Sequence, residues 1–175
     1  MDISRRVLLL STLMAAGCSA PIESDKSSIK PNTIEDENEE CSFELYPVGR
    51  IQRKGKVVSL NIFKKYTDAL MGLDGFSHIF VLYWFDRNDT PEKRNILQVH
   101  PRGNKKNPLT GVFACRVPVR PNLIALSLCR ILSVRDNIVY IENIDALNNS
   151  PILDIKPYIP QIDHKVKDVH LPDWL

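Results

Sequence analysis

Two arginines in the second half of the chain, Arg116 and Arg120, have side chains suited to binding an anion. A guanidinium group presents its N–H donors in a planar fork, so it can hold a carboxylate or a phosphate through two hydrogen bonds, which a lysine ammonium cannot do as well. The segment Arg120-Pro121-Asn122 also suits a simple turn, because Pro and Asn favour turns for local reasons. The sequence therefore supports both an anion site and a turn here.

A second group of basic side chains lies in a long polar stretch, residues 86–109, which also holds three prolines and one glycine. Irregular loops of this length are uncommon unless they have a function. The basic residues of this stretch could contact the backbone of a nucleic acid, or could simply form a solvated loop tip; they include Arg94, Arg102, Lys105 and Lys106.

The histidines and cysteines show little of the spacing that is typical of metal ligands or catalytic nucleophiles. His78 lies in an apolar run, where it is either a satisfied core histidine or a general base. The other histidines lack metal-ligand spacing and the cysteines form no CxxC pair, so the sequence predicts no metal site and no disulfide framework. Cys115 and Cys129 lie in apolar segments and are expected to be small buried side chains.

The elements that must position these residues are mostly strands. Val58, Leu60 and Ile62 alternate with polar residues, which is typical of a half-buried strand. Strands are predicted over residues 43–51, 56–62, 112–117, 124–134 and 138–142, with a core strand buried on both faces over 76–85 and a hairpin turn at 135–137. One short helix is predicted over residues 66–73, ending at Gly72 or Gly75. The fold class is therefore mostly β, a small antiparallel β-barrel with one short helix and long loops.

The first 40 residues differ from the rest. Arg5 and Arg6 precede a short apolar run that ends in Ala15-Ala16-Gly17-Cys18, which resembles a lipobox, so we expect a signal peptide over residues 1–18 and lipidation of Cys18. Ser4-Arg5-Arg6 also resembles a twin-arginine export signal. The alternatives to a leader are a frayed N-terminal extension and a misplaced start codon. Residues 19–40 hold two basic against seven acidic side chains and are expected to form a disordered acidic tether.

Residues 41–175 form one predicted domain. They carry 19 Lys and Arg against 13 Asp and Glu, a net charge of about +6. This charge favours an anionic partner, although it is also common on ordinary soluble domains.

Four segments of this domain resemble one known family. They are the residues 47–51 (PVGRI), 68–78 (DALMGLDGFSH), 111–122 (GVFACRVPVRPN) and 144–158 (IDALNNSPILDIKPY). In their order and identity they resemble the TsaA-like, or TrmO-type, family of S-adenosylmethionine-dependent tRNA adenosine N6-methyltransferases. The resemblance implies a small β-barrel that forms a homodimer and binds S-adenosylmethionine without a Rossmann domain; this chain has no GxGxxG after a strand.

The implied reaction is N6-methylation of threonylcarbamoyl-adenosine beside the tRNA anticodon. By resemblance, the cofactor pocket is lined by Asp86, Arg87, Arg116, Leu128, Ile144, Asp145, Ala146 and Leu147. Asp145 could bond ribose hydroxyls or balance the sulfonium charge, and the backbone around Ala146 and Leu147 could bond the adenine edge. Catalytic candidates are Asp145 and His78, and the implied substrate contacts are Arg120, Asn122, Lys156 and Tyr158. The segment 154–158 could instead be an ion-paired strand end in which Tyr158 packs.

The chain also departs from the family pattern. It lacks the Pro-Arg-Gln-like segment before the second strand, and Asp86 stands where many members have His. Two functions remain in view: a tRNA methyltransferase, which requires the cytoplasm, and an exported, membrane-anchored lipoprotein whose TsaA-like domain binds another ligand without methyl transfer.

Overall fold

The computed structural model describes residues 44–175. The predicted signal peptide over residues 1–18 with the lipidation site Cys18, the tether over 19–40 and the start of the domain at residues 41–43 lie outside the described residues. Within residues 44–175, no helix is long and apolar enough to cross a membrane.

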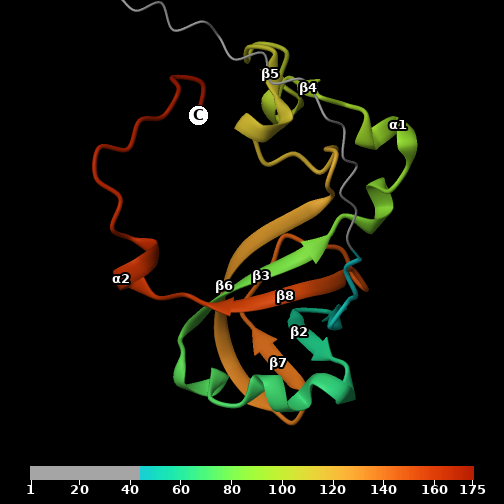
Figure 1. Ribbon diagram of the computed structural model, residues 1–175, viewed down its shortest axis with the longest axis vertical. Coiled ribbons are helices and arrows are strands. Elements are labelled where there is room, and N and C mark those ends of the chain that lie inside the picture. Colours follow the sequence, from blue (N-terminus) through green and yellow to red (C-terminus); the bar gives the residue numbers. More distant parts are fainter. Residues whose placement is uncertain (1–43) are drawn as a thin grey trace, which may run out of the picture. The chain divides into compact units, whose positions relative to one another are not determined.

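Six strands form a closed barrel, in which every neighbouring pair is antiparallel. The order around the barrel is β1-β2-β7-β6-β3-β8. The strands are β1 (Gly49–Lys54), β2 (Val57–Ile62), β3 (His78–Trp84), β6 (Ile124–Arg135), β7 (Ile138–Ile141) and β8 (Pro151–Pro157). β3, β6 and β8 run beside one another across the middle of Figure 1. The predicted small antiparallel barrel is confirmed.

The barrel interior is filled by aliphatic side chains that alternate along the strands. Fully burying such a side chain contributes about 1.5–3 kcal/mol to stability, so these residues supply most of the driving force for folding. They include Ile51, Leu60, Ile79, Val81, Val139, Ile141 and Ile152.

The predicted burial of β3 on both faces is wrong. Ile79, Val81 and Tyr83 face the interior and are buried, whereas the alternate residues, such as Phe80 and Trp84, are only half-buried. The reason is the barrel itself, because each strand of a closed barrel has one face toward the interior and the other toward the outside.

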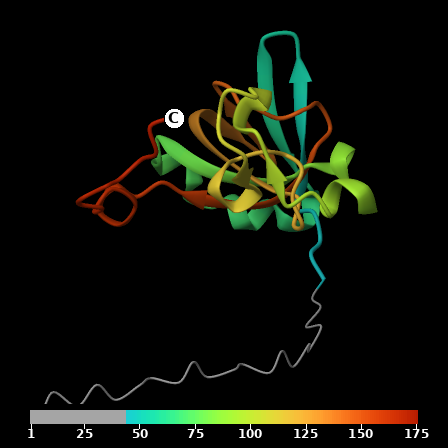
Figure 2. The same cartoon turned by 90° about the horizontal axis from the view of Figure 1, so that it is seen from above.

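Two glycines shape the β1–β2 hairpin. A Cβ atom on Gly49 would lie 2.5 Å from the carbonyl oxygen of Asn61, so only glycine lets the two strands approach this closely. Gly55 has a φ of +61° in the tight turn that joins Lys54 to Val57. In Figure 2 this hairpin projects beyond the other strands.

The predicted helix over residues 66–73 is present in 3₁₀ form. It consists of η1 (Lys64–Leu70) and η2 (Leu73–Gly75), which are separated by the non-helical Met71 and by Gly72, whose φ is 81°. Short 3₁₀ pieces of this kind commonly serve as connectors between strands.

A cap segment, residues 86–122, joins β3 to β6 and lies at one end of the molecule in Figure 1. Its elements are η3 (Asp86–Asn88), α1 (Pro91–Arg94), β4 (Gln98–Val99), η4 (Pro101–Gly103), β5 (Thr110–Gly111) and η5 (Val112–Ala114). The strand predicted over 112–117 is wrong: the Val112 N–H bonds to the Leu97 carbonyl, and the chain then turns, leaving Phe113 exposed. A last short helix, α2 (Pro160–Asp163), follows β8.

Candidate active site

Two adjoining hollows lie where β3 ends and the cap segment begins. Tyr83, Phe85, Arg116 and Asp145 line both of them, so the hollows share part of their wall. The larger, which we call the Arg120 hollow, has a volume of about 470 Å³ and is also lined by Phe113, Cys115, Arg120 and Ser127. The smaller, the Ala146 hollow, has a volume of about 280 Å³ and is also lined by Asp86, Arg87, Ala146, Leu147 and Ser150.

Tyr83 forms the floor that the two hollows share. It follows Val81 on the inward face of β3 and is only 3% exposed. Its hydroxyl donates a hydrogen bond to the backbone carbonyl of Asp145, and its ring packs edge to face against Phe85 at 5.7 Å. Burial raises the pKa of the Tyr83 hydroxyl, so the group is a neutral donor at ordinary pH. Tyr83 therefore ties the loop after β7 to the barrel core.

The charged side chains at the junction of the hollows are free of intramolecular ion pairs. Within residues 44–175, ion pairs join only Asp89 to Arg94 and Asp154 to Lys156. Arg116 and Asp145 are both exposed, so each can bind a ligand without first breaking a protein contact.

Arg120 and Asp86 are held more firmly. An Nη atom of Arg120 lies 3.3 Å from the carbonyl oxygen of Cys115, and the guanidinium lies 6.0 Å from the centre of the Phe113 ring. Asp86 accepts a hydrogen bond of 3.4 Å from the buried Ser150 hydroxyl. One hollow thus presents an aromatic ring beside cations, and the other presents carboxylates beside a backbone loop.

The comparisons with known proteins agree with this fold. The model of the family described as the tRNA-methyltransferase O N-terminal domain matches residues 45–164. The chain belongs to this family. The predicted TsaA-like, TrmO-type membership is therefore confirmed.

Relatives of known sequence and structure show how much of each protein is shared. The chain is 44% identical over 121 residues to a probable S-adenosyl-L-methionine-binding protein of Methanocaldococcus jannaschii, covering 69% of this chain and 96% of the relative. It is 41% identical over 103 residues to the mouse tRNA (adenine(37)-N6)-methyltransferase, covering 59% of this chain but only 23% of that enzyme. The crystal structure of TrmO from Pseudomonas aeruginosa matches with a TM-score of 0.60 and 27% identity, over 79% of this chain and 64% of that one.

Most of the cofactor residues expected for the family come together. Asp86, Arg87, Arg116, Asp145, Ala146 and Leu147 all line the Ala146 hollow. Ile144 lies beneath them in the core and anchors the loop. Leu128 is on the outer face of β6, is 51% exposed and lines neither hollow, so its role in cofactor binding stays a prediction.

The remaining expected site residues are placed differently. Arg120 lines its hollow, whereas Asn122 precedes β6 and lines neither. His78 begins β3; a strand advances about 3.3 Å per residue, which puts His78 about 16 Å from Tyr83 along the strand. His78 is half-buried, and its Nδ1 lies 2.9 Å from the Ser77 hydroxyl.

Lys156 and Tyr158 lie at the same end of β3 as His78. Lys156 is opposite Phe80 in the sheet and pairs with Asp154 at 2.8 Å. Tyr158 packs edge to face on Phe80 at 5.7 Å, and its hydroxyl lies 3.0 Å from Nδ1 of His164. These contacts fit the ion-paired strand end with a packing tyrosine, and the substrate contacts of Lys156 and Tyr158 stay a prediction.

Sequence reasoning missed Tyr83, Phe85 and Phe113 as parts of the site. The first two belong to the apolar run over residues 76–85, so the sequence suggests that they are core residues. The signal that could have found them is their position at the end of that run, where a barrel strand opens to its rim. No group of three or more side chains that could hold a metal ion gathers within residues 44–175.

Proposed function

We propose that this chain is an S-adenosylmethionine-dependent methyltransferase that acts on tRNA, at N6 of the threonylcarbamoyl-adenosine next to the anticodon. The observation that supports this most is that Arg116 and Asp145 line both of the adjoining hollows. A methyl transfer requires donor and acceptor in adjoining compartments, because the nucleophile must approach the methyl carbon in line at about 3–3.5 Å. The mouse relative is named for tRNA adenine N6-methylation and the archaeal relative for S-adenosyl-L-methionine binding, which also supports the proposal.

The Ala146 hollow suits the cofactor. Sites for small molecules commonly enclose about 300–1,000 Å³, and the volume of this hollow, about 280 Å³, is close to the lower end of that range. The carboxylates of Asp86 and Asp145 can bond ribose hydroxyls or face the cationic groups of S-adenosylmethionine, and the loop at Ala146 can meet the adenine edge. When bound, the cofactor supplies a methyl group on a sulfonium, which leaves its sulfur as the C–S electron pair returns to sulfur.

The Arg120 hollow suits the acceptor nucleoside. Phe113 is 78% exposed and offers a ring face on which a base can stack. The threonylcarbamoyl group ends in a carboxylate, and the guanidinium groups of Arg116 and Arg120 can bind it through paired hydrogen bonds. The modification would thus be recognised by the arginines and the base by the aromatic ring.

Asp145 is the favoured proton acceptor. When N6 forms its bond to the methyl carbon it must lose one proton, and the attached carbonyl makes that proton more acidic than in an ordinary adenine. The Asp145 carboxylate borders both hollows, whereas His78 begins β3 at its other end. Positioning supplies most of the rate, and Asp145 contributes by taking up the proton.

A homodimer is part of the proposal. Leu126, Leu128 and Leu132 project from the outer face of β6 and are about half exposed, beside Phe80 of β3. Exposed apolar side chains that share one face of a strand are a feature of many protein interfaces. Sedimentation of the full chain should give a dimer that Leu128→Asp dissociates and that Met71→Asp, at an exposed site in another loop, leaves intact; a wild-type monomer would contradict the homodimer.

The direct test of the activity is methyl transfer. The full chain is incubated with S-adenosylmethionine labelled in the methyl group and with tRNA that contains threonylcarbamoyl-adenosine, and the nucleosides are analysed by mass spectrometry. We expect label at N6 of that nucleoside, a strong loss of rate in Asp145→Asn and no change in Asp74→Asn, a control in an exposed turn. Label absent from the tRNA, or an active Asp145→Asn variant, would refute the assignment.

The exported lipoprotein with a binding function is a second proposal, and it rests on the lipobox-like sequence that ends at Cys18. Labelling of cells with a radioactive fatty acid should then mark the wild-type chain at the membrane but not Cys18→Ser. A soluble, unlabelled wild-type chain would remove the main support for this alternative.

A further inference from the structure

We infer that Arg53 is a positioning residue for the candidate site, because its side chain holds the carbonyl side of the loop Ile144–Leu147 and leaves three backbone N–H groups of that loop to a ligand. This inference rests on the proposed function, since it concerns the wall of the Ala146 hollow. It adds a residue of β1 that does not itself line either hollow.

Arg53 occupies an unusual place for an arginine. Residues 49, 51 and 53 of β1 share one face of the strand; Gly49 and Ile51 are buried, and Arg53 is the next residue on this inward face, opposite the buried Val58. A half-buried guanidinium needs partners for its N–H donors. Within residues 44–175, no carboxylate lies within ion-pair distance of Arg53.

Backbone carbonyls of the loop supply those partners. The Nε of Arg53 donates to the Ala146 carbonyl at 2.8 Å, and an Nη atom donates to the Ile144 carbonyl. The backbone N–H of Arg53 bonds the Asn148 side chain at 2.8 Å, which fixes the end of the loop. The carbonyl between these two, that of Asp145, accepts from the Tyr83 hydroxyl. Three consecutive carbonyls are therefore held from the barrel.

The orientation of the carbonyls fixes the amides. In a trans peptide the C=O and the following N–H point in opposite directions, so three held carbonyls determine where the N–H groups of Asp145, Ala146 and Leu147 point. Among the described residues, none of these three N–H groups has a protein acceptor. The same three residues line the Ala146 hollow. Arg53, together with Tyr83, thus holds a row of unpaired donors ready for the polar edge of a ligand.

Arginine is needed for this arrangement and lysine is not equivalent. The rigid fork of the guanidinium reaches two carbonyls at once, whereas a single ammonium on a flexible stem does not fix both. Arg50, on the opposite face of β1, makes one bond of 3.0 Å to the Asn149 carbonyl, beyond the loop in question. Arg50→Ala is therefore a matched control on the same strand.

The test compares Arg53→Ala, Arg53→Lys and Arg50→Ala in the full chain. NMR relaxation of ¹⁵N-labelled protein without ligand should show the order parameters of residues 145–147 falling from about 0.85 in the wild type to below about 0.6 in Arg53→Ala. Calorimetry should show S-adenosylmethionine binding weakened about 10- to 100-fold in Arg53→Ala and less in Arg53→Lys, with Arg50→Ala close to the wild type. Guanidinium ion, added at a concentration too low to unfold the chain, should restore part of the affinity of Arg53→Ala.

Each outcome decides a separate question. Unchanged order parameters in both Arg53 variants, or a mobile loop with unchanged affinity, would overturn the positioning role. Arg53→Lys keeps the stem and the charge, so a folding failure of Arg53→Ala does not remove the test. A wild-type chain that binds no S-adenosylmethionine would refute the proposed function, and the hold of Arg53 on the loop would still be decided by the order parameters.

Discussion

Tyr83→Phe removes one hydroxyl from the floor shared by the two hollows. The tyrosine is 3% exposed, and its hydroxyl is the donor to the Asp145 carbonyl. Leaving a fully buried carbonyl without its donor costs about 1–3 kcal/mol, and the bond to Asp145 is partly buried. Removing the hydroxyl also spares its own desolvation, so we expect the free energy of unfolding to fall by about 1–2 kcal/mol. In a domain of this size that corresponds to a melting temperature lower by about 3–8 °C.

Urea unfolding of the wild type and of Tyr83→Phe, followed by tryptophan fluorescence, measures this difference. Tyr140→Phe is the control, because Tyr140 is half-buried on β7 and its hydroxyl has no hydrogen-bond partner among the described residues; its effect should stay within about 0.5 kcal/mol. S-adenosylmethionine should bind Tyr83→Phe about 5- to 30-fold more weakly, since the loop loses one of its ties. Equal stability of Tyr83→Phe and the wild type would refute the reasoning that this hydroxyl ties the loop to the core.

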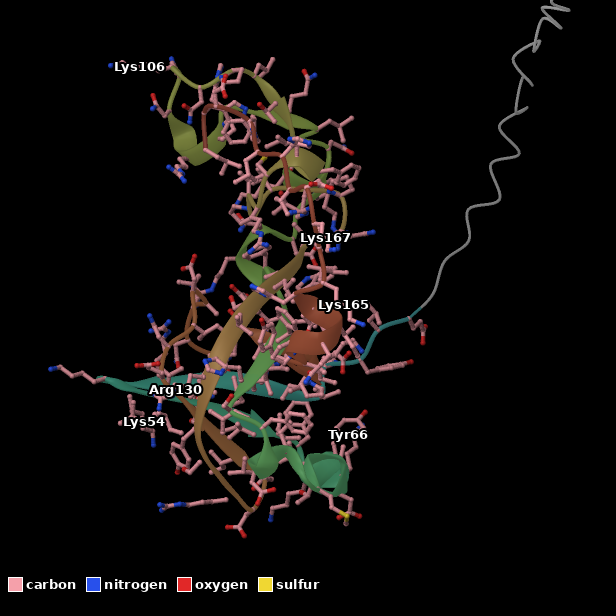
Figure 3. The ribbon with its side chains drawn as sticks, turned by 90° about the vertical axis from the view of Figure 1, so that its left-hand side faces the viewer. Lys54, Tyr66, Lys106, Arg130, Lys165 and Lys167 are labelled. Atoms are coloured by element: carbon pink, nitrogen blue, oxygen red, sulfur yellow. The ribbon has the colours of Figure 1, made fainter. Side chains whose placement is uncertain are left out.

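Three further predictions concern other parts of the molecule. Gly49→Ala should lower the free energy of unfolding by about 1–3 kcal/mol in urea titrations, because its Cβ would lie 2.5 Å from a backbone oxygen of β2; an unchanged midpoint would show that the strands can separate freely. Burial raises the pKa of the Cys129 thiol to about 11. The thiol holds its proton more tightly in the folded state than in the unfolded state, so the free energy of unfolding should fall by up to about 2–3 kcal/mol as the pH rises from 9 to 11. Cys129→Ala should lose less stability over this pH interval. Equal pH dependence of the free energy of unfolding in the two proteins would contradict the prediction. Lys106 lies at the far tip of the cap segment in Figure 3, clear of the barrel, where it can contact the tRNA backbone. The double variant Lys105→Ser/Lys106→Ser should therefore weaken tRNA binding and reduce its salt dependence. An unchanged salt dependence would show that these lysines do not contact the tRNA.

The strands that the sequence predicts best are those with regular alternation. Val58, Leu60 and Ile62 alternate strictly, and β6 and β7 are joined by a tight turn at Asp136, so the pairing followed from local signals. Val112 and Phe113 are apolar, but they form a 3₁₀ turn, because tertiary contacts with Leu97 decide the backbone there. A short run of apolar residues in the sequence does not by itself distinguish a strand from a turn.

The site was predictable only in part. Family segments identified Arg116 and the loop at Asp145, which the structure brings together. They could not separate Lys156 and Tyr158 from these residues, because the register between β8 and β3 decides at which end of β3 these two residues lie. Arg53 carries no sequence signal, since its role depends on backbone carbonyls about 90 positions away along the chain.

The central claim is that the hollows joined at Arg116 and Asp145 form a site for S-adenosylmethionine. Isothermal calorimetry on the full chain tests it most directly, with Asp145→Ala and Arg116→Ala beside the wild type and Asp74→Asn as control. We expect saturable binding by the wild type and the control, and affinities at least about tenfold lower in the two site variants. Absence of heat with millimolar ligand, or equal affinities in all four proteins, would contradict the account.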